Sequence, residues 1–194
     1  MTPLPSDTLR RLLAWALTLA AFGWALALAA APYLVTHSGT RRSGALTGAT
    51  VYIAGSLLCH QRPARTFHLW GTQLPVCARC LGLYVGAALG TAVAMMMAFV
   101  PSWHDRQHLS PGSLRVWRRM LLAAAVPTAI TALLEWGGRV HVSNGARAWA
   151  GAPLGAVVAW IVASGLLGSR AAGDRGPGVN CVDAHDNRRA AADK

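Results

Sequence analysis

The stretch LLAWALTLAAFGWALALAAAPYLV, residues 12–35, decides the class of fold. It contains no charged residue, and nearly all of its side chains are apolar. A helix needs about 20 such residues to cross the hydrocarbon core of a bilayer, so we expect a transmembrane helix near 11–34. Arg10 and Arg11 precede this stretch, as basic residues precede the apolar core of a signal peptide. The apolar stretch exceeds the ~7–15 residues of a signal-peptide core, which favours an uncleaved anchor and leaves cleavage open.

Three later runs have the same character. Residues 80–104 and 148–169 carry no formal charge, and residues 120–138 are interrupted only by Glu135. In lipid such runs must be helical, because no water is present to satisfy the backbone N–H and C=O groups. We predict further spans near 80–100, 119–137 and 149–168. The expected fold class is therefore all-α, a helical transmembrane bundle with four spanning helices.

One additional stretch, 43–61, has no charge but is more polar than the four runs. It contains several serines and threonines and three glycines, Gly44, Gly48 and Gly55. We expect one short helix over 43–60. Its length and polarity allow it to be re-entrant, interfacial or a fifth span.

The composition also indicates a membrane protein. Of 194 residues, 54% are hydrophobic and only 13% are charged, which is about half the charged share of an average soluble domain. The net charge is +11, but the basic residues lie between long charge-free runs. A nucleic-acid-binding protein would spread them over amphipathic or disordered segments. We therefore expect a lipid bilayer, and no nucleic acid, as the partner.

The basic residues also predict the orientation of the helices. With four spans and a cytoplasmic N-terminus, 11 lysines and arginines lie inside and 7 outside. A fifth span over 43–61 would reverse these counts, so the excess of positive charge inside favours four spans with both termini in the cytoplasm. In either case the loops 61–79 and 138–148 share one face of the membrane.

Three regions follow along the chain. Residues 1–10 form a cytoplasmic N-terminus, residues 11–168 the membrane domain, and residues 169–194 a polar tail that we expect to be disordered. Cys181 is the one cysteine in that tail. No feature of the sequence decides the oligomeric state.

Small residues recur within two of the predicted spans. Gly82, Gly86 and Gly90 are four residues apart, and Gly151 and Gly155 repeat this spacing. Such a spacing lets two helix backbones approach closely in lipid. We interpret these glycines as a packing surface without chemistry of its own.

The chemistry is concentrated between residues 57 and 86. Cys59 and His60 are adjacent, and Cys77 and Cys80 form a CxxC pair. A CxxC turn can place two thiolates on one zinc ion, and Cys59 with His60 or His68 would complete a tetrahedral site. We predict metal ligands at Cys59, His60, Cys77 and Cys80, with zinc as the metal. Neighbouring arginines would offset the charge of three thiolates.

Other chemistries fit the same cysteines. Cys77, Cys80 and Cys59 can act as catalytic thiols of a membrane thiol–disulfide oxidoreductase, with a periplasmic thiol protein or a quinone as partner. A plain structural disulfide is another interpretation. A small transporter or channel is a third class of function, indicated only by Glu135 within a predicted span.

A second polar group follows the third predicted span. A carboxylate at membrane depth is costly, so Glu135 should be paired or functional. It can pair with Arg139 one helical turn later. Alternatively Glu135, Asn144 and Arg147 meet the cysteine loop in a shared pocket, where Arg147 can bind an anion or a carboxylate. The residues expected to support the ligands or to contact a substrate are Gln61, Arg65, His68, Arg79, Glu135, Asn144 and Arg147.

The segment carries a long composite motif. This motif resembles the signature of the DUF2085 family of predicted bacterial membrane proteins, over roughly residues 55–165. The resemblance implies a small polytopic protein of unassigned function, and hence a multi-pass protein of the bacterial cytoplasmic (inner) membrane. Thr66 and Val142 depart from the expected pattern, which has serine at the first position and a hydroxyl residue at the second. The matching residues are Cys59-His60-Gln61, Pro63, Arg65-Thr66-Phe67, Gly71, Pro75-Val76-Cys77-Ala78-Arg79-Cys80, Gly82-Leu83-Tyr84-Val85-Gly86, Ser143-Asn144, Arg147, Gly151 and Gly155.

Overall fold

The computed structural model describes residues 6–37, 42–99, 111–138 and 140–168. Most of the predicted N-terminal region (residues 1–5), the predicted tail 169–194 with Cys181, and Arg139 lie outside the described residues. The described segments are almost entirely helical, as expected, and contain one two-stranded antiparallel hairpin. In order, the elements are α1 (Ser6–His37), α2 (Arg42–Leu58), the 3₁₀ turn η1 (Pro63–Arg65), β1 (His68–Leu69), β2 (Thr72–Gln73), α3 (Ala78–Ala98), α5 (Pro111–Trp136) and α6 (Asn144–Gly168).

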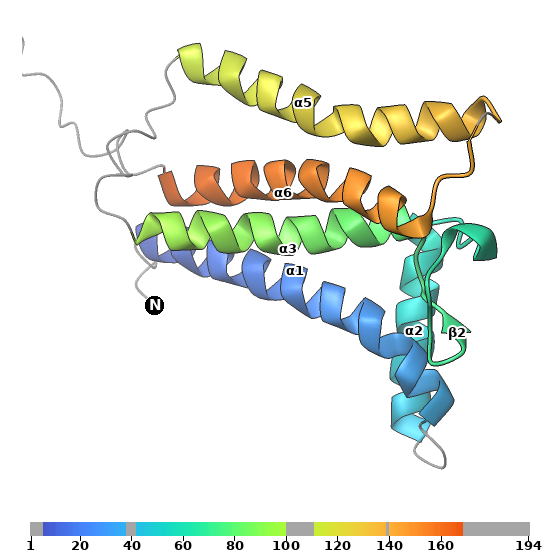
Figure 1. Cartoon of the computed structure of the whole chain (residues 1–194). Coiled ribbons are helices and arrows are strands. Elements are labelled where there is room, and N and C mark those ends of the chain that lie inside the picture. The colour runs from blue at the N-terminus through green and yellow to red at the C-terminus, as the bar shows by residue number, and fades with distance from the viewer. Residues whose placement is uncertain (1–5, 38–41, 100–110, 139, 169–194) are drawn as a thin grey trace, which may run out of the picture.

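Among the described residues, four helices are long and apolar enough to cross a membrane, in agreement with the predicted spans. These are α1, α3, α5 and α6, which extend in one common direction (Figure 1). Helix α5 begins earlier than expected, at Pro111, because Arg115, Arg118 and Arg119 form helical turns ahead of the apolar run. Many large apolar side chains on these helices are exposed, as lipid-facing side chains are.

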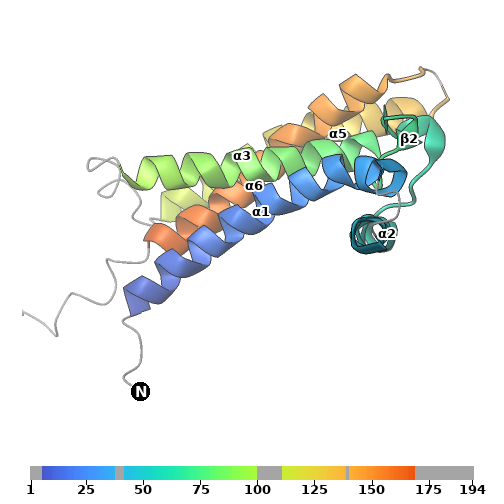
Figure 2. The same ribbon diagram turned by 90° about the horizontal axis from the view of Figure 1, so that it is seen from below.

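Helix α2 runs across one end of this bundle (Figures 1 and 2). It is shorter than the four spanning helices and does not follow their direction. Its apolar side chains Leu46, Ile53 and Leu57 are 66%, 63% and 82% exposed and recur at helical spacing. The crosswise direction of α2 fits the interfacial disposition, one of the three expected, better than a fifth span beside the other four.

Helices α3 and α6 form the closest pair in the bundle, and glycine is the reason. A Cβ atom added at Gly82, Gly86 or Gly90 would lie only 2.0–2.1 Å from a backbone carbonyl oxygen of α6. A Cβ atom added at Gly155 on α6 would lie 2.0 Å from the Leu83 carbonyl oxygen of α3. The predicted packing role is confirmed, because only a residue without a side chain permits this approach.

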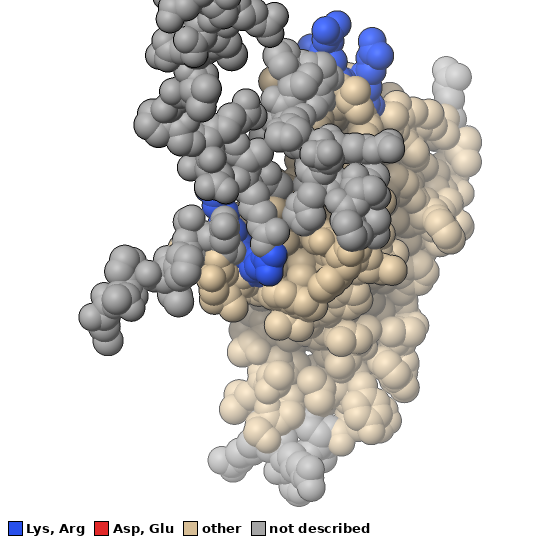
Figure 3. Space-filling view, turned by 90° about the vertical axis from the view of Figure 1, so that its left-hand side faces the viewer, with Lys and Arg blue, Asp and Glu red and all other residues tan. Residues whose placement is uncertain are grey.

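The remaining spans pack around this pair. Trp117 on α5 stacks on Trp160 on α6, and the Thr128 hydroxyl donates a hydrogen bond to the Ala150 carbonyl at 2.6 Å. On the other side, α1 contacts both α2 and α3. The end of the bundle opposite α2 shows basic side chains and no acidic ones among the described residues (Figure 3). Arg115, Arg118 and Arg119 belong to the first turns of α5, and this helix starts at the same end of the bundle (Figure 1).

Candidate functional site

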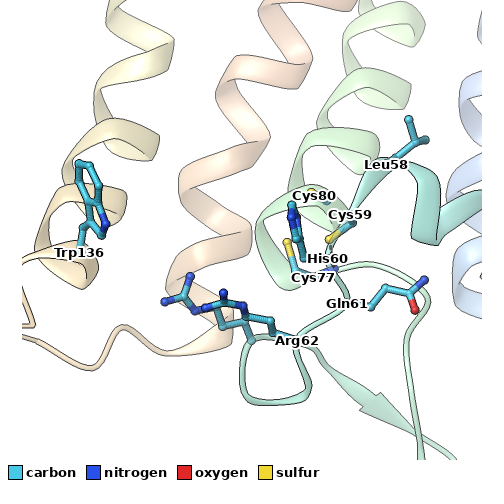
Figure 4. Close-up of a pocket in the computed structure, with 9 residues that line it drawn as sticks. Leu58, Cys59, His60, Gln61, Arg62, Cys77, Cys80 and Trp136 are labelled. Atoms are coloured by element: carbon cyan, nitrogen blue, oxygen red, sulfur yellow. Dashed lines mark hydrogen bonds between the residues drawn. The ribbon is translucent and has the colours of Figure 1, made fainter.

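Three cysteines converge where α2 ends and α3 begins. The Sγ atoms of Cys59, Cys77 and Cys80 all lie within 4.8 Å of one another, and each residue is a half-buried free thiol. Figure 4 shows the three sulfur atoms turned toward one another. A zinc ion bonded to thiolates at about 2.3 Å holds its sulfur atoms about 3.8 Å apart, so small side-chain movements would close this group on one ion.

Each sulfur is positioned by a helix end. Cys59 extends α2 by one hydrogen bond, from its amide to the Gly55 carbonyl at 2.9 Å. Cys77 is the N-cap of α3 and its side chain makes no capping bond, while Cys80 lies in the first turn. A CxxC sequence at a helix start thus presents both of its sulfurs on one side, toward the end of α2.

A close backbone approach joins the two helix ends. A Cβ atom at Gly55 would lie 2.4 Å from the Pro75 carbonyl oxygen, so glycine lets α2 lie directly against the segment before Cys77. Gln61, in the left-handed region at φ 46°, donates from Nε2 to the Tyr52 and Pro75 carbonyls at 3.0 and 2.7 Å. Gln61 therefore ties the cysteine-bearing segments together and points away from the sulfur atoms (Figure 4).

The electrostatic surroundings of Cys77 favour its thiolate. The backbone amide of Cys77 donates to the Cys59 Sγ at 3.2 Å. The hydrogen bond from the Cys80 side chain, helped by bonds from the Cys80 and Arg79 amides and from Cys59, lowers the pKa of Cys77 to about 5 against the opposing effect of burial. A thiolate at this helix N-terminus also interacts favourably with the helix dipole. Metal-binding chemistry requires this deprotonated form.

A pocket of about 430 Å³ opens beside the cysteines. His60 lines it and is exposed, although it does not belong to the group of ligand atoms within 4.8 Å. His68 is also exposed and lies in β1, paired with Gln73, and it does not line this pocket. The structure thus places His60, but not His68, at the opening above the sulfurs. The full lining is Leu58, Cys59, His60, Gln61, Arg62, Arg65, Cys77, Cys80 and Trp136.

A second polar cluster is centred on Glu135, whose side chain is only 5% exposed. Arg147 donates from Nε to its Oε1. Arg79 and Arg65 approach Oε2 at 3.5 and 3.8 Å. The carboxylate from α5 is therefore surrounded by guanidinium groups from α6, from α3 and from the turn η1. The alternative partner Arg139 lies outside the described residues.

The same cluster anchors the cysteine loop. The Asn144 side-chain amide donates to the Thr66 carbonyl at 3.0 Å, and Arg147 donates to the Ala64 carbonyl at 3.4 Å. Arg147 also donates to the Asn144 Oδ1. The predicted meeting of Glu135, Asn144 and Arg147 with the loop is thus seen in the geometry.

Sequence reasoning missed two members of this region. Thr131 accepts a hydrogen bond from Arg79 at 3.3 Å, and Trp136 lines two of the pockets while 90% exposed. Thr131 lies one turn before Glu135 on α5, a spacing that could have indicated a shared partner. Trp136 lies at the end of a span, where aromatic residues are common, and no local signal in the sequence marks it as part of a pocket.

Together these features define a polytopic membrane protein with a three-cysteine centre beside an arginine–carboxylate cluster. The chain belongs to the DUF2085 family, described as "Predicted membrane protein", whose family model matches residues 59–161. The match begins at Cys59 and includes both polar clusters.

Two curated relatives match shorter segments. An uncharacterized protein of Methanocaldococcus jannaschii is 35% identical over 68 residues, which cover 35% of this chain and 44% of the relative. An uncharacterized protein of Methanothermobacter thermautotrophicus is 53% identical over 30 residues, covering 16% of this chain and 27% of the relative. The matches thus span less than half of either relative, and both are archaeal, so they do not bear out the bacterial location. No solved structure gives a significant match.

Proposed function

We propose that this membrane protein binds one zinc ion through the thiolates of Cys59, Cys77 and Cys80. The observation that carries the proposal is the convergence of the three Sγ atoms within 4.8 Å of one another. Cys59 is separated from the CxxC pair by a turn and a hairpin, so the fold has to bring the thiols together. Convergence of three free thiols suits a shared ion better than a disulfide, which would use two and leave one.

The chemistry of the donors supports zinc in particular. Thiolates are soft ligands that select zinc, copper(I) or iron–sulfur clusters. A cluster usually takes four thiolates, whereas zinc accepts three together with one nitrogen or oxygen ligand. His60 is our proposed fourth ligand, because it follows Cys59 directly and lines the pocket beside the sulfurs. Its imidazole would have to turn toward the ion to complete the tetrahedron.

We also propose on which side of the membrane the cysteine centre lies. The whole-sequence count, 11 arginines and lysines on the side of the N-terminus against 7 on the side of the cysteines, supports a cytoplasmic location for the end opposite α2, since cytoplasmic flanks of spans are enriched in these residues. The cysteines would then lie on the extracytoplasmic face. Labelling of metal-depleted intact cells with a membrane-impermeant maleimide should modify Cys59, Cys77 or Cys80, and labelling only after lysis would reverse this orientation.

Metal content tests the proposal. The full chain is purified in a mild detergent without chelators, and zinc per chain is measured by mass spectrometry of the metals. We expect about one zinc in the wild type and in the matched control Cys181→Ser, which also removes one thiol. Cys59→Ser, Cys77→Ser and Cys80→Ser should each lose most of the metal. A wild type without stoichiometric metal would refute the proposal.

A fold control keeps this result interpretable. Variants that lose zinc should still elute as well-dispersed protein and should still be helical by circular dichroism. Addition of cadmium to metal-free wild type should produce thiolate-to-metal charge-transfer absorption, and this absorption should be absent from the Cys77→Ser variant. Charge-transfer absorption of equal strength in both proteins would exclude the three-cysteine site.

Thiol–disulfide exchange is the second candidate function, favoured by the low pKa of Cys77 at a helix N-terminus. Here the Cys77 and Cys80 thiols would lose two electrons and two protons as their S–S bond forms. A periplasmic disulfide protein or a quinone would accept both. Alkylation with a mass-adding maleimide, before and after reduction, should then reveal a reversible disulfide. Thiols that stay reduced in cells under both oxidising and reducing conditions would exclude it.

A further inference from the structure

The side chain of Arg65 lies where three pockets meet. It lines the cysteine pocket, a pocket of about 240 Å³ beside Arg79 and Glu135, and a pocket of about 390 Å³ beside Arg62 and Arg147. The three spaces therefore adjoin around one guanidinium. We refer to the pocket of about 390 Å³ as the arginine pocket; its lining is Arg62, Ala64, Arg65, Glu135, Gly138, Val140, His141 and Arg147.

The charges around these pockets do not balance. Arg62, Arg65, Arg79 and Arg147 contribute four positive charges, and Glu135 contributes one negative charge, which leaves +3 among these residues. A zinc ion with three thiolates would add only −1, so the region would remain positive at +2. Unbalanced charge next to an apolar bundle is costly and favours binding of a counter-charge.

The arginines differ in how far their hydrogen-bond donors are used. Arg147 is held by Glu135, Asn144 and the Ala64 carbonyl, and its side chain is 10% exposed. Arg65 only approaches Glu135, at 3.8 Å, and its side chain is 42% exposed. Within the described part of the chain Arg62 forms no ion pair, and it lines both the cysteine pocket and the arginine pocket. Free donor capacity is therefore concentrated at Arg62 and Arg65.

One buried hydrogen-bond donor, on Arg79, also lacks an acceptor. The Nε atom of Arg79 is buried and has no hydrogen-bond partner, although the Nη2 atom of Arg79 donates to Thr131 and to Glu135. Arg79 lines the pocket beside Arg65. Buried N–H groups are nearly always satisfied, so this unsatisfied donor shows that the region around Arg65 is short of hydrogen-bond acceptors, although Arg79 does not itself line the arginine pocket.

From these observations we propose that the arginine pocket binds a phosphate group, with Arg62 and Arg65 as its principal donors. Guanidinium groups bind the oxygens of phosphate bidentately, and two of them suit its charge. The pocket is lined by Glu135 in the last turn of α5 and by Gly138 and Val140 in the loop that follows, so it lies at the end of the spanning helices, where phospholipid headgroups would meet water. The phosphate can therefore belong to a lipid headgroup or to a soluble ion, and both present the same oxygens.

Calorimetric titration of the full chain in a nonionic detergent tests this assignment. The probes are inorganic phosphate, a short-chain phosphatidic acid and a phosphatidylcholine of equal chain length, all at low ionic strength. We expect one phosphate-bearing ligand to bind per chain, and Arg62→Gln with Arg65→Gln to weaken it at least about tenfold, since each charge-assisted bond lost costs that order. The matched control is Arg115→Gln with Arg118→Gln, which removes equal charge at the start of α5 and should change affinity less than about twofold.

The outcomes separate the sources of the phosphate. Binding of inorganic phosphate shows that the group alone suffices, and binding of phosphatidic acid alone identifies a lipid headgroup. No binding of any phosphate probe, or equal affinity in the two double variants, overturns the proposal. Zinc content measured on the same preparations distinguishes this result from failure of the proposed metal site, because Arg62→Gln with Arg65→Gln should retain the metal.

Discussion

The backbone amide of Cys77 donates a hydrogen bond to the sulfur of Cys59 at 3.2 Å. This bond joins the end of α2 to the start of α3 and directs an N–H donor at the half-buried sulfur of Cys59. Such N–H donors stabilise thiolates and orient metal ligands. The relationship between these two residues is therefore both the structural link and the electrostatic basis of the proposed centre.

The first prediction concerns the reactivity of Cys77 in metal-free, reduced protein. Because the folded pKa is lowered to about 5, the thiolate is present above that pH and is lost as the pH falls through it. At pH 6 about nine-tenths of Cys77 should be ionised, against about 0.3% of an ordinary thiol. Its iodoacetamide alkylation rate should therefore change little between pH 6 and 8, while that of N-acetylcysteine rises steeply.

Peptide mass spectrometry can assign this rate to one sulfur. Trypsin cleaves after Arg79, which separates Cys77 from Cys80. A rate for the Cys77 peptide that rises tenfold per pH unit, as for the reference thiol, would show that its pKa is not lowered.

The second prediction concerns Gly55, where α2 lies so close to Pro75 that no methyl group fits between them. A Gly55→Ala substitution should push the end of α2 away, because its Cβ would meet the Pro75 carbonyl oxygen at 2.4 Å. Zinc affinity should fall about 10-fold or more, as it does when groups that orient metal ligands are lost. Competition with a zinc chelator measures this. Gly23→Ala on α1 is the control, since nothing lies within 4 Å of its added Cβ.

The third prediction concerns the contact between α3 and α6. A Gly86→Ala substitution introduces a Cβ atom 2.1 Å from the Ala152 carbonyl oxygen, and a backbone atom cannot move aside cheaply. Overpacking of this kind costs about 1–3 kcal/mol, so the midpoint of thermal unfolding in detergent should fall by several degrees. Gly165→Ala on α6, with open space around its Cβ, should leave that midpoint nearly unchanged. Equal midpoints for both variants would contradict the packing described.

The fourth prediction concerns Glu135, which is 5% exposed and shared by three arginines. A Glu135→Gln substitution leaves these guanidinium groups without their counter-charge, and breaking a buried pair in this way costs about 3–5 kcal/mol. Arg147→Gln should be similarly damaging. The double variant should lose clearly less free energy of unfolding than the two single variants lose in sum, as measured by denaturant unfolding. Additive losses would show that the two side chains do not interact.

Much of the fold could be predicted from the sequence, because lipid imposes strong rules on it. Charge-free runs of about 20 residues can only be helices there, and glycines four residues apart predict their contact. The disposition of α2 could not be predicted. Its length and polarity fit three arrangements, and only its direction relative to the bundle distinguishes them.

The site was predictable only in part. The CxxC pair and the nearby Cys59 indicated a common centre, but their convergence depends on Gly55 and on the left-handed conformation of Gln61, which no local pattern encodes. The hairpin turn at Trp70 and Gly71, both with positive φ, keeps His68 in an exposed strand. Three arginines share one carboxylate because four separate segments meet there, which is a property of the tertiary fold.

X-ray absorption at the zinc edge tests the central claim most directly. It measures the kind, number and distance of the atoms bonded to the metal in the intact protein as purified. We predict three sulfur atoms at about 2.3 Å and one nitrogen or oxygen at about 2.0 Å. In Cys59→Ser, the number of sulfur atoms should fall or the metal should be lost. A wild-type spectrum fitted by nitrogen and oxygen alone would contradict the claim that Cys59, Cys77 and Cys80 hold a common ion.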